Sequence, residues 1–279
     1  MRAIYHRGWI LPAVPVPDLR GVQPLRRPVA LDYNWDGSTL IENYSLLDPA
    51  VAAFVCIPAL LLAALVAGTN SAWRRSGSTS SQAARAAAVV GVLAAAWMGV
   101  SWRLAATGVL QQWDRVPPPF GLLLVSMVAL AVLIVLSPLG VRMANTIPLW
   151  MLVGVQAFRL PLELAMHAMA ERGVMPAQMT YTGRNFDIVT GAAAIVVAAL
   201  LLAGRAGRPL VLAWNILGFA LLLNVIIVAI VSTPIFRMFG DDQLNVFVTY
   251  TPFVWLPTVM VLAALAGHLL VFRALRARE

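Results

Sequence analysis

Apolar runs of about 20 residues recur along this chain, and they constrain its fold more than any other feature. A helix of about 20 apolar residues is long enough to cross the hydrocarbon core of a bilayer. Of the 279 residues, 61% are hydrophobic and 11% are charged, a balance that soluble domains do not show. The sequence therefore predicts an all-α fold, a bundle of helices that crosses a membrane several times.

Seven such runs follow residue 48, and each of them predicts one transmembrane helix. In chain order they cover residues 49–68, 86–110, 120–139, 146–170, 187–203, 209–232 and 252–272. Asn145 or Thr146 suits the N-cap of the fourth helix, and Asp187 suits that of the fifth. Pro209 and Pro252 suit the first turns of the sixth and seventh helices, where proline is tolerated.

The arginines between the spans predict the orientation of the bundle, because cytoplasmic loops carry an excess of positive residues. One set of loops and ends holds nine arginines: Arg74, Arg75, Arg85, Arg142, Arg205, Arg208, Arg273, Arg276 and Arg278. The alternate set holds four: Arg115, Arg172, Arg184 and Arg237. We therefore expect the C-terminus inside and the N-terminus outside. Membrane orientation also explains the net charge of +8 without a nucleic-acid partner, since the arginines flank apolar segments.

Residues 1–47 differ from the rest of the chain because they are rich in proline and carry several charges. Two interpretations fit this composition. One is a disordered or surface-lying tail. The other is a gene start placed too far upstream, with the true start nearer residue 40. Under either interpretation we expect the transmembrane domain to occupy residues 48–279.

The fourth span carries the most unusual polar residues of the chain. Four polar side chains fall within an arc of about 80° when this span is drawn as a helix at 100° per residue: Gln156, Arg159, Glu163 and His167. Pro161 lies among them and lacks a backbone amide, so the helix should be disturbed one turn earlier. Broken helix at membrane depth is tolerated where it lines a cavity or is buried in protein.

Further polar residues are predicted on the outer side of the membrane or near its middle: Arg103, Arg184, Asn185, Asp187 and Asn224. A charged side chain left to lipid near the bilayer centre costs about 2.5–3.5 kcal/mol, so Arg103, Arg159 and Glu163 should face the interior. Arg159 and Glu163 are four residues apart and can pair on their own helix. The economical arrangement of all nine residues is one outward-facing polar pocket.

Two hypotheses about function follow from this pocket. In the first, it binds or passes a small polar or anionic solute, because Arg103, Arg159 and Arg184 are predicted on one side. In the second, the chain is a structural or partner-binding membrane protein, and the same residues only fix the packing of the helices. The lipid bilayer is the one partner that either hypothesis requires, and the protein partners stay open.

A third hypothesis is a copper-handling or catalytic membrane protein. Thioethers with an imidazole suit Cu(I), and four methionines flank His167 at the outer face: Met166, Met169, Met175 and Met179. Methionine is also ordinary filler in apolar helices. Glu163 with His167 could act as an acid–base couple, but the sequence offers no nucleophile, no Gly-x-Ser-x-Gly elbow and no three-histidine zinc site. We therefore predict no catalytic residue, no metal ligand and no cofactor.

The central motifs resemble those of an uncharacterised family of bacterial multi-pass inner-membrane proteins. They read Gln156-Ala-Phe-Arg159-x-Pro161-x-Glu163-x-x-x-His167 and Met175-Pro-x-Gln-Met179-Thr-x-x-Gly183-Arg184-Asn185-Phe-Asp187. Shorter motifs extend the likeness: Trp214-Asn215-Ile, Ser232-Thr-Pro234 and Pro252-Phe-Val-Trp-Leu-Pro257. The resemblance covers residues 86–279 and implies a bacterial inner membrane. It implies no activity and assigns no role to any residue.

Overall fold

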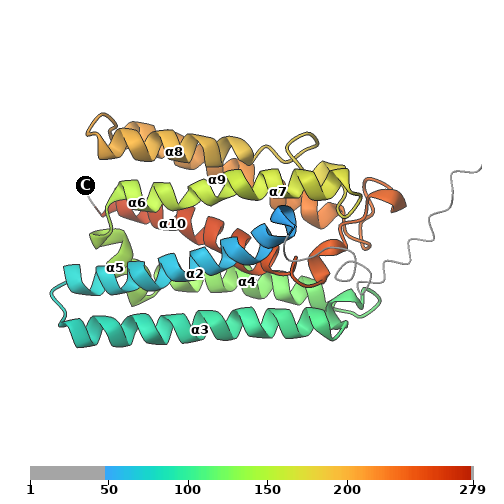
Figure 1. Cartoon of the computed structure of the whole chain (residues 1–279), viewed down its shortest axis with the longest axis horizontal. Coiled ribbons are helices and arrows are strands. Elements are labelled where there is room, and N and C mark those ends of the chain that lie inside the picture. Colours follow the sequence, from blue (N-terminus) through green and yellow to red (C-terminus); the bar gives the residue numbers. More distant parts are fainter. Residues whose placement is uncertain (1–47, 278–279) are drawn as a thin grey trace, which may run out of the picture.

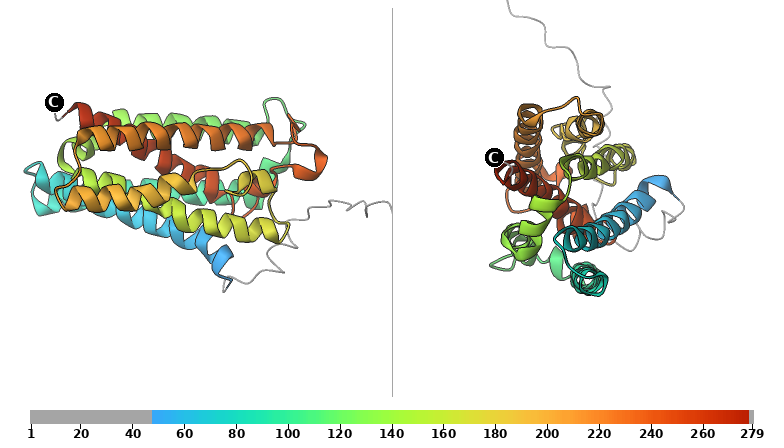
Figure 2. Two further views of the ribbon diagram at one scale, coloured as in Figure 1. Left: turned by 90° about the horizontal axis from the view of Figure 1, so that it is seen from above. Right: turned by 90° about the vertical axis from the view of Figure 1, so that its left-hand side faces the viewer.

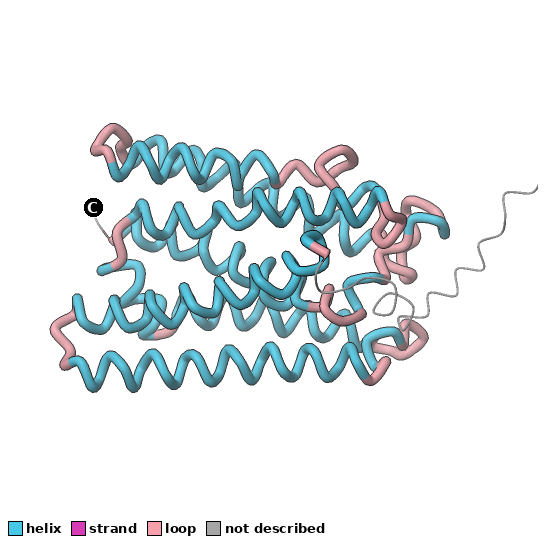
Figure 3. Tube along the Cα trace, viewed as in Figure 1, coloured by secondary structure: helices cyan, strands magenta, loops and turns pink. Residues whose placement is uncertain are grey.

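The computed structural model describes residues 48–277, and every regular element among them is a helix (Figure 3). The all-α prediction is therefore confirmed for this part of the chain. The two interpretations of residues 1–47 fall outside the described residues.

Within residues 48–277, six helices are long and apolar enough to cross a membrane, which supports a multi-pass membrane protein. Four of them are single helices: α2 (Pro49–Arg75), α3 (Ser80–Ala106), α4 (Pro119–Leu136) and α9 (Arg208–Val231). The other two crossings, Leu149–Glu171 and Leu256–Arg276, are composite. The fifth predicted span is the apolar helix α8 (Ile188–Leu202), whose 15 residues give a length of about 22 Å. This length is short of the hydrocarbon core, so a seventh crossing stays a prediction.

The two composite crossings contain irregular turns. Leu149–Glu171 consists of α6 (Leu149–Gly154), the 3₁₀ turn Val155–Phe158 and α7 (Arg159–Glu171). The 3₁₀ turn lies one turn before Pro161, where the missing amide was predicted to disturb the helix. Leu256–Arg276 consists of the π-helical turn Leu256–Val261 and α10 (Leu262–Arg276).

The helices lie roughly side by side, and α10 runs obliquely between them (Figures 1 and 2). Its π-helical start packs beside α2 and α3. There the indole of Trp97 on α3 donates to the carbonyl of Thr258, and the indole of Trp255, just before the π-helical turn, donates to the carbonyl of Met98 on α3. Its end packs beside α9, where Arg208 donates to the carbonyl of Leu275. Helices α4 and α9 both pack against α10 but hardly touch each other. The connections α2–α3 and α8–α9 lie at one end of the bundle, and the connections α3–α4, α7–α8 and α9–α10 lie at the other (Figure 1).

Local capping explains where several helices begin. Asp48 accepts the amide of Ala50 to start α2, and Thr79 forms a capping box with Gln82 at the start of α3. Pro209 lies in the first turn of α9, as predicted.

Two predicted helix starts are wrong. Asn145 and Thr146 do not cap the fourth span, because they end an additional helix, α5 (Pro138–Thr146). Ser137 caps α5, with a proline directly after it, and this start signal was overlooked. Pro252 does not start the last crossing either. The regular helix there begins only at Leu256, after a turn-rich segment.

Gly191 allows α8 to pack closely against the crossing that carries the polar stripe. A Cβ at this position would lie 2.6 Å from the backbone nitrogen of Leu160 and 3.0 Å from the Cβ of Arg159. A backbone atom cannot move away from the added Cβ as the end of a flexible side chain can. Gly191→Ala should therefore lower the free energy of unfolding by about 1–3 kcal/mol. Unfolding by SDS titration in mixed micelles, followed by circular dichroism, measures this loss.

Gly99 on α3 provides the matched control, because a Cβ there would meet nothing within 4 Å. Gly99→Ala should raise stability by up to about 1 kcal/mol, since alanine restricts the unfolded chain. A loss in Gly191→Ala no larger than the change in Gly99→Ala would contradict the close packing of α8 on α7.

Candidate functional site

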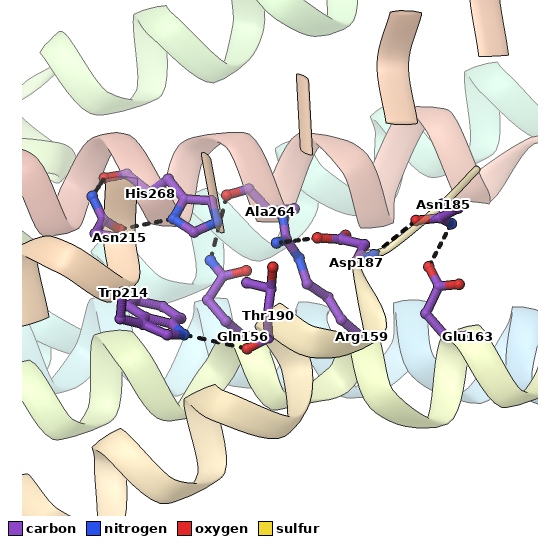
Figure 4. A network of polar contacts seen from close by, with 10 residues as sticks. All are labelled: Gln156, Arg159, Glu163, Asn185, Asp187, Thr190, Trp214, Asn215, Ala264 and His268. Carbon is purple, nitrogen blue, oxygen red and sulfur yellow. Dashed lines mark hydrogen bonds and ion pairs between the residues drawn. The ribbon is translucent and has the colours of Figure 1, made fainter. Parts of the chain in front are cut away.

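A row of buried polar side chains runs along the middle of the bundle (Figure 4). It has two parts. The part nearer the α7–α8 connection, here called the outer part, contains Arg159, Glu163, Asn185 and Asp187. The part farther from that connection, here called the inner part, contains Gln156, Thr190, Trp214, Asn215 and His268. They come from the α6–α7 crossing, from the loop and first turn of α8 that follow it, and from helices α9 and α10.

Arg159 pairs with Asp187 and not with Glu163. Its Nη1 lies 2.8 Å from Oδ1 of Asp187, and the two side chains are almost fully buried. The structure shows no ion pair between Arg159 and Glu163 in the described part of the chain, so the predicted pairing on one helix is wrong. The close approach of α8 at Gly191 explains the difference, because it brings Asp187 beside the guanidinium.

Asp187 occupies the N-cap position of α8, but its side chain caps no helix amide. The predicted capping role is therefore also wrong. The buried guanidinium of Arg159 takes the carboxylate as its counter-charge instead.

Asn185 connects the two carboxylates of the outer part. Its Nδ2 donates to Oε1 of Glu163 at 2.7 Å and to the carbonyl of Met179 at 3.0 Å. Its Oδ1 accepts the amide of Asp187 at 3.0 Å. Asn185 thus uses its donors and its acceptor to hold the loop before α8 against α7 (Figure 4).

The inner part joins α9 to α10 through Asn215 and His268. Nδ2 of Asn215 donates to the carbonyl of His268 at 3.1 Å, so its Oδ1 is the acceptor 2.7 Å from Nδ1 of the imidazole. The proton of the ring therefore lies on Nδ1. Nε2 is buried and has no partner among the described groups. Gln156 reaches α10 as well and donates to the carbonyl of Ala264 at 3.4 Å.

Two of the predicted arginines do not join the buried row. Arg103 is exposed in the last turn of α3, although it was predicted to face the interior. A long side chain near a helix end can reach the membrane interface, so it need not be buried. Arg184 is exposed too, and its guanidinium lies 5.2 Å from the ring centre of Phe239. Asn224 donates to the carbonyl of Arg184 at 2.7 Å and so holds the loop and not the pocket.

His167 lies apart from the buried row, in a partly exposed cluster at the end of α7. Its ring stands 4.6 Å from that of Tyr181, and its nitrogens lie 3.5 Å from Thr182 and from Glu171. The four methionines around it in sequence pack into an apolar core cluster instead: Met166, Met169, Met175 and Met179. No group of three or more His, Cys, Asp and Glu side chains in residues 48–277 could hold a metal ion.

A cavity of about 430 Å³ reaches the outer part of the polar row. Its walls come mainly from apolar residues of α4, α7, α9 and the start of the last crossing. The polar residues on its wall are Arg159, Glu163, Asn185, Asp187 and Asn245. Several of their buried atoms have no hydrogen-bond partner among the described groups: Nε and Nη2 of Arg159, Oε2 of Glu163 and Oδ1 of Asn245.

Sequence reasoning did not find Asn245 or Thr190. Asn245 follows a loop rich in acids, where an amide residue carries no periodic signal, yet its Nδ2 bonds the carbonyl of Ala229 at 3.1 Å. Thr190 resembles an ordinary residue of an apolar helix. Its carbonyl accepts the indole of Trp214 at 3.3 Å, a contact between helices that only the fold reveals.

Comparison with known families matches residues 118–276, which are more than half of the chain and include both central motifs. Comparisons with curated proteins and with solved structures gave no match. The matched family has no assigned activity, in agreement with the resemblance inferred from the motifs. The chain thus belongs to the family described as Domain of unknown function (DUF8737).

Proposed function

We propose that this membrane protein binds or passes a small, uncharged polar solute at Arg159 and Glu163. One observation carries the proposal: two guanidinium nitrogens and a carboxylate oxygen, all buried and unpartnered, belong to residues on the wall of a 430 Å³ cavity. A buried polar atom without a partner costs about 1–3 kcal/mol, so a ligand that satisfies these three atoms stabilises the protein. The cavity has the volume of a small-molecule site.

The charge balance of the site favours an uncharged ligand over an anion. The anionic alternative drew on three arginines, and only Arg159 lies at the cavity. Asp187 already neutralises Arg159, and Glu163 adds a second carboxyl beside them. An incoming anion would meet at least as much negative as positive charge in a poorly screened environment. An uncharged group with one acceptor and one donor, such as a hydroxyl or an amide, matches Arg159 and Glu163 together.

The competing interpretation is the structural one. The chain of contacts from Arg159 through Asp187 and Asn185 to Glu163 ties α7 to α8, and this alone would justify the residues. The two interpretations differ in what the unpartnered atoms do. In a purely structural network they gain nothing from any added solute.

The proposal includes the placement of the protein in the membrane. We propose seven crossings in a bacterial inner membrane, with α8 as the short one, the N-terminus outside and the C-terminus inside. The excess of arginines at the end of the bundle that holds the α2–α3 and α8–α9 connections supports this orientation. The cavity would then lie in the outer half of the membrane.

Three probes of equal size test the proposal: propionamide, propionate and propylammonium. Thermal unfolding of the protein in lipid nanodiscs is followed by tryptophan fluorescence at rising probe concentration. We expect propionamide alone to raise Tm, in a saturating manner, by a few degrees. This shift corresponds to about 1.4 kcal/mol at ten times Kd.

Glu163→Leu should abolish the shift, because it removes the acceptor at the cavity wall. Glu171→Leu is the control, since Glu171 is exposed two turns later on the same helix. A larger shift with propionate would replace the proposal with an anion site. No shift with any probe would favour the structural interpretation.

A further inference from the structure

Exposed and half-buried lining residues lie on α4 and α9, which indicates that the cavity opens sideways between these two helices. Its rim on α4 includes Val125 and Val128, which are 67% and 41% exposed, and its rim on α9 includes the half-buried Ile226 and Ile230. These helices hardly touch each other, because α10 runs obliquely behind them (Figure 2). In a bilayer, an apolar rim in the middle of two membrane-spanning helices faces lipid chains.

The deepest end of the cavity, where it meets the outer part of the polar row, is polar and almost fully buried. Arg159 and Glu163 are 1% and 2% exposed there, close to Asn185 and Asp187. Polarity therefore rises from the lipid-facing rim to the centre of the bundle. A molecule that fills such a space has an apolar part at the rim and a polar part at the deepest end.

Loops cover the cavity on the side of the outer aqueous phase. The loop before α8 and the loop before the last crossing both line the cavity, through Met179 and Val248. Gln178 ties these segments together, since its Nε2 donates to Oγ of Ser232 at 3.1 Å and to the carbonyl of Gln243 at 2.7 Å. These covering residues are buried, so the lipid side offers the more open path to Arg159.

We infer that the ligand is an uncharged, single-chain amphiphile that enters from the bilayer between α4 and α9. Its hydroxyl or amide head group would lie at Arg159 and Glu163, and its chain would lie along the apolar rim. This inference rests on the proposed function and names the substrate class of the same site. The ligand would reach the site from lipid and not from water.

Two carbodiimides distinguish the routes to Glu163. A carboxyl group adds across the C=N bond of the reagent to give an O-acylisourea, which rearranges to a stable N-acylurea without loss of any atom. Dicyclohexylcarbodiimide dissolves in lipid, whereas the cationic dimethylaminopropyl analogue stays in water. The full-length protein in nanodiscs is treated with each reagent, and mass spectrometry of its peptides locates the adducts. We expect dicyclohexylcarbodiimide alone to label Glu163.

Matched variants test the entrance and the ligand class. Ile226→Trp fills the rim and should strongly reduce the labelling of Glu163, whereas Ile227→Trp, next to it but 59% exposed and outside the cavity, should not. Monooctanoylglycerol, an uncharged amphiphile with hydroxyls, should protect Glu163. At ten times its Kd the labelling should fall about tenfold, because few sites remain free. Octanoate and glycerol should not protect.

Each other outcome overturns a defined part of the inference. Labelling by the water-soluble reagent, with protection by glycerol, would overturn entry from lipid and leave a small polar solute as the ligand. Protection by octanoate alone would overturn the uncharged head group. Labelling that monooctanoylglycerol does not reduce would overturn the amphiphile. No labelling by either reagent would overturn the inference and the proposed function together.

Discussion

Asp187→Ala should lower the free energy of unfolding by about 3–5 kcal/mol, because it leaves the guanidinium of Arg159 buried without its counter-charge. The ion pair is 2.8 Å long, and both side chains are almost fully buried. Adding Arg159→Leu to Asp187→Ala should restore much of the loss, since a buried apolar residue costs less than a buried unpaired charge. SDS titration of the two single variants and the double variant measures the three free energies.

Arg237 and Asp241 provide a control of the same residue types. They form an ion pair of 2.9 Å at an exposed position, where solvent and salt screen the charges. Asp241→Ala should therefore cost no more than about 1 kcal/mol. Equal losses for Asp187→Ala and Asp241→Ala would contradict a buried pair. A double variant no more stable than Asp187→Ala would mean that Asp187 acts through something other than Arg159.

The long apolar helices and their order could be predicted from the sequence because span length and hydropathy are local properties, whereas the seventh crossing stays a prediction. In the two composite crossings, these local properties predict one irregular turn and miss the other. The 3₁₀ turn before Pro161 follows from one missing amide and was predictable. The delayed start at Leu256 depends on how the preceding loop packs, which no local pattern reports.

One part of the candidate site was predicted correctly from the sequence, and another part was not. A helical projection correctly brought Gln156, Arg159 and Glu163 to one buried face. It could not choose the partner of Arg159, because the choice depends on how closely α8 approaches at Gly191. Arg103 was predicted in the interior because of its charge alone. It lies in the last turn of α3, where its long side chain can reach the membrane interface.

The lateral cavity was beyond prediction for a related reason. Its existence depends on the oblique path of α10, which keeps α4 and α9 apart (Figures 1 and 2). The sequence of α4 is apolar all round and gives no sign of a rim facing lipid beside a polar site. The outward-facing polar pocket predicted from the sequence therefore becomes, in our proposal, a site covered by loops and open to lipid.

Asn185→Ala should cost about 3 kcal/mol of stability, because one side chain satisfies three buried groups. Its removal leaves Oε1 of Glu163, the carbonyl of Met179 and the amide of Asp187 without their partner. Each buried polar group that loses its hydrogen bond costs about 1–3 kcal/mol, and partial relaxation of the loop should reduce the sum. The free energy of unfolding from SDS titration is again the measure.

Asn224→Ala is the matched control, since Asn224 also bonds the loop before α8, but at an exposed position through the single contact to the carbonyl of Arg184. Water can replace that donor, so the loss should stay near 1 kcal/mol. The comparison also bears on the route to the cavity. If Asn185→Ala costs no more than Asn224→Ala, water must reach Glu163 and Met179 as easily as it reaches Arg184. The loops would then not shield the site from water, and entry from lipid would no longer be favoured over entry from water.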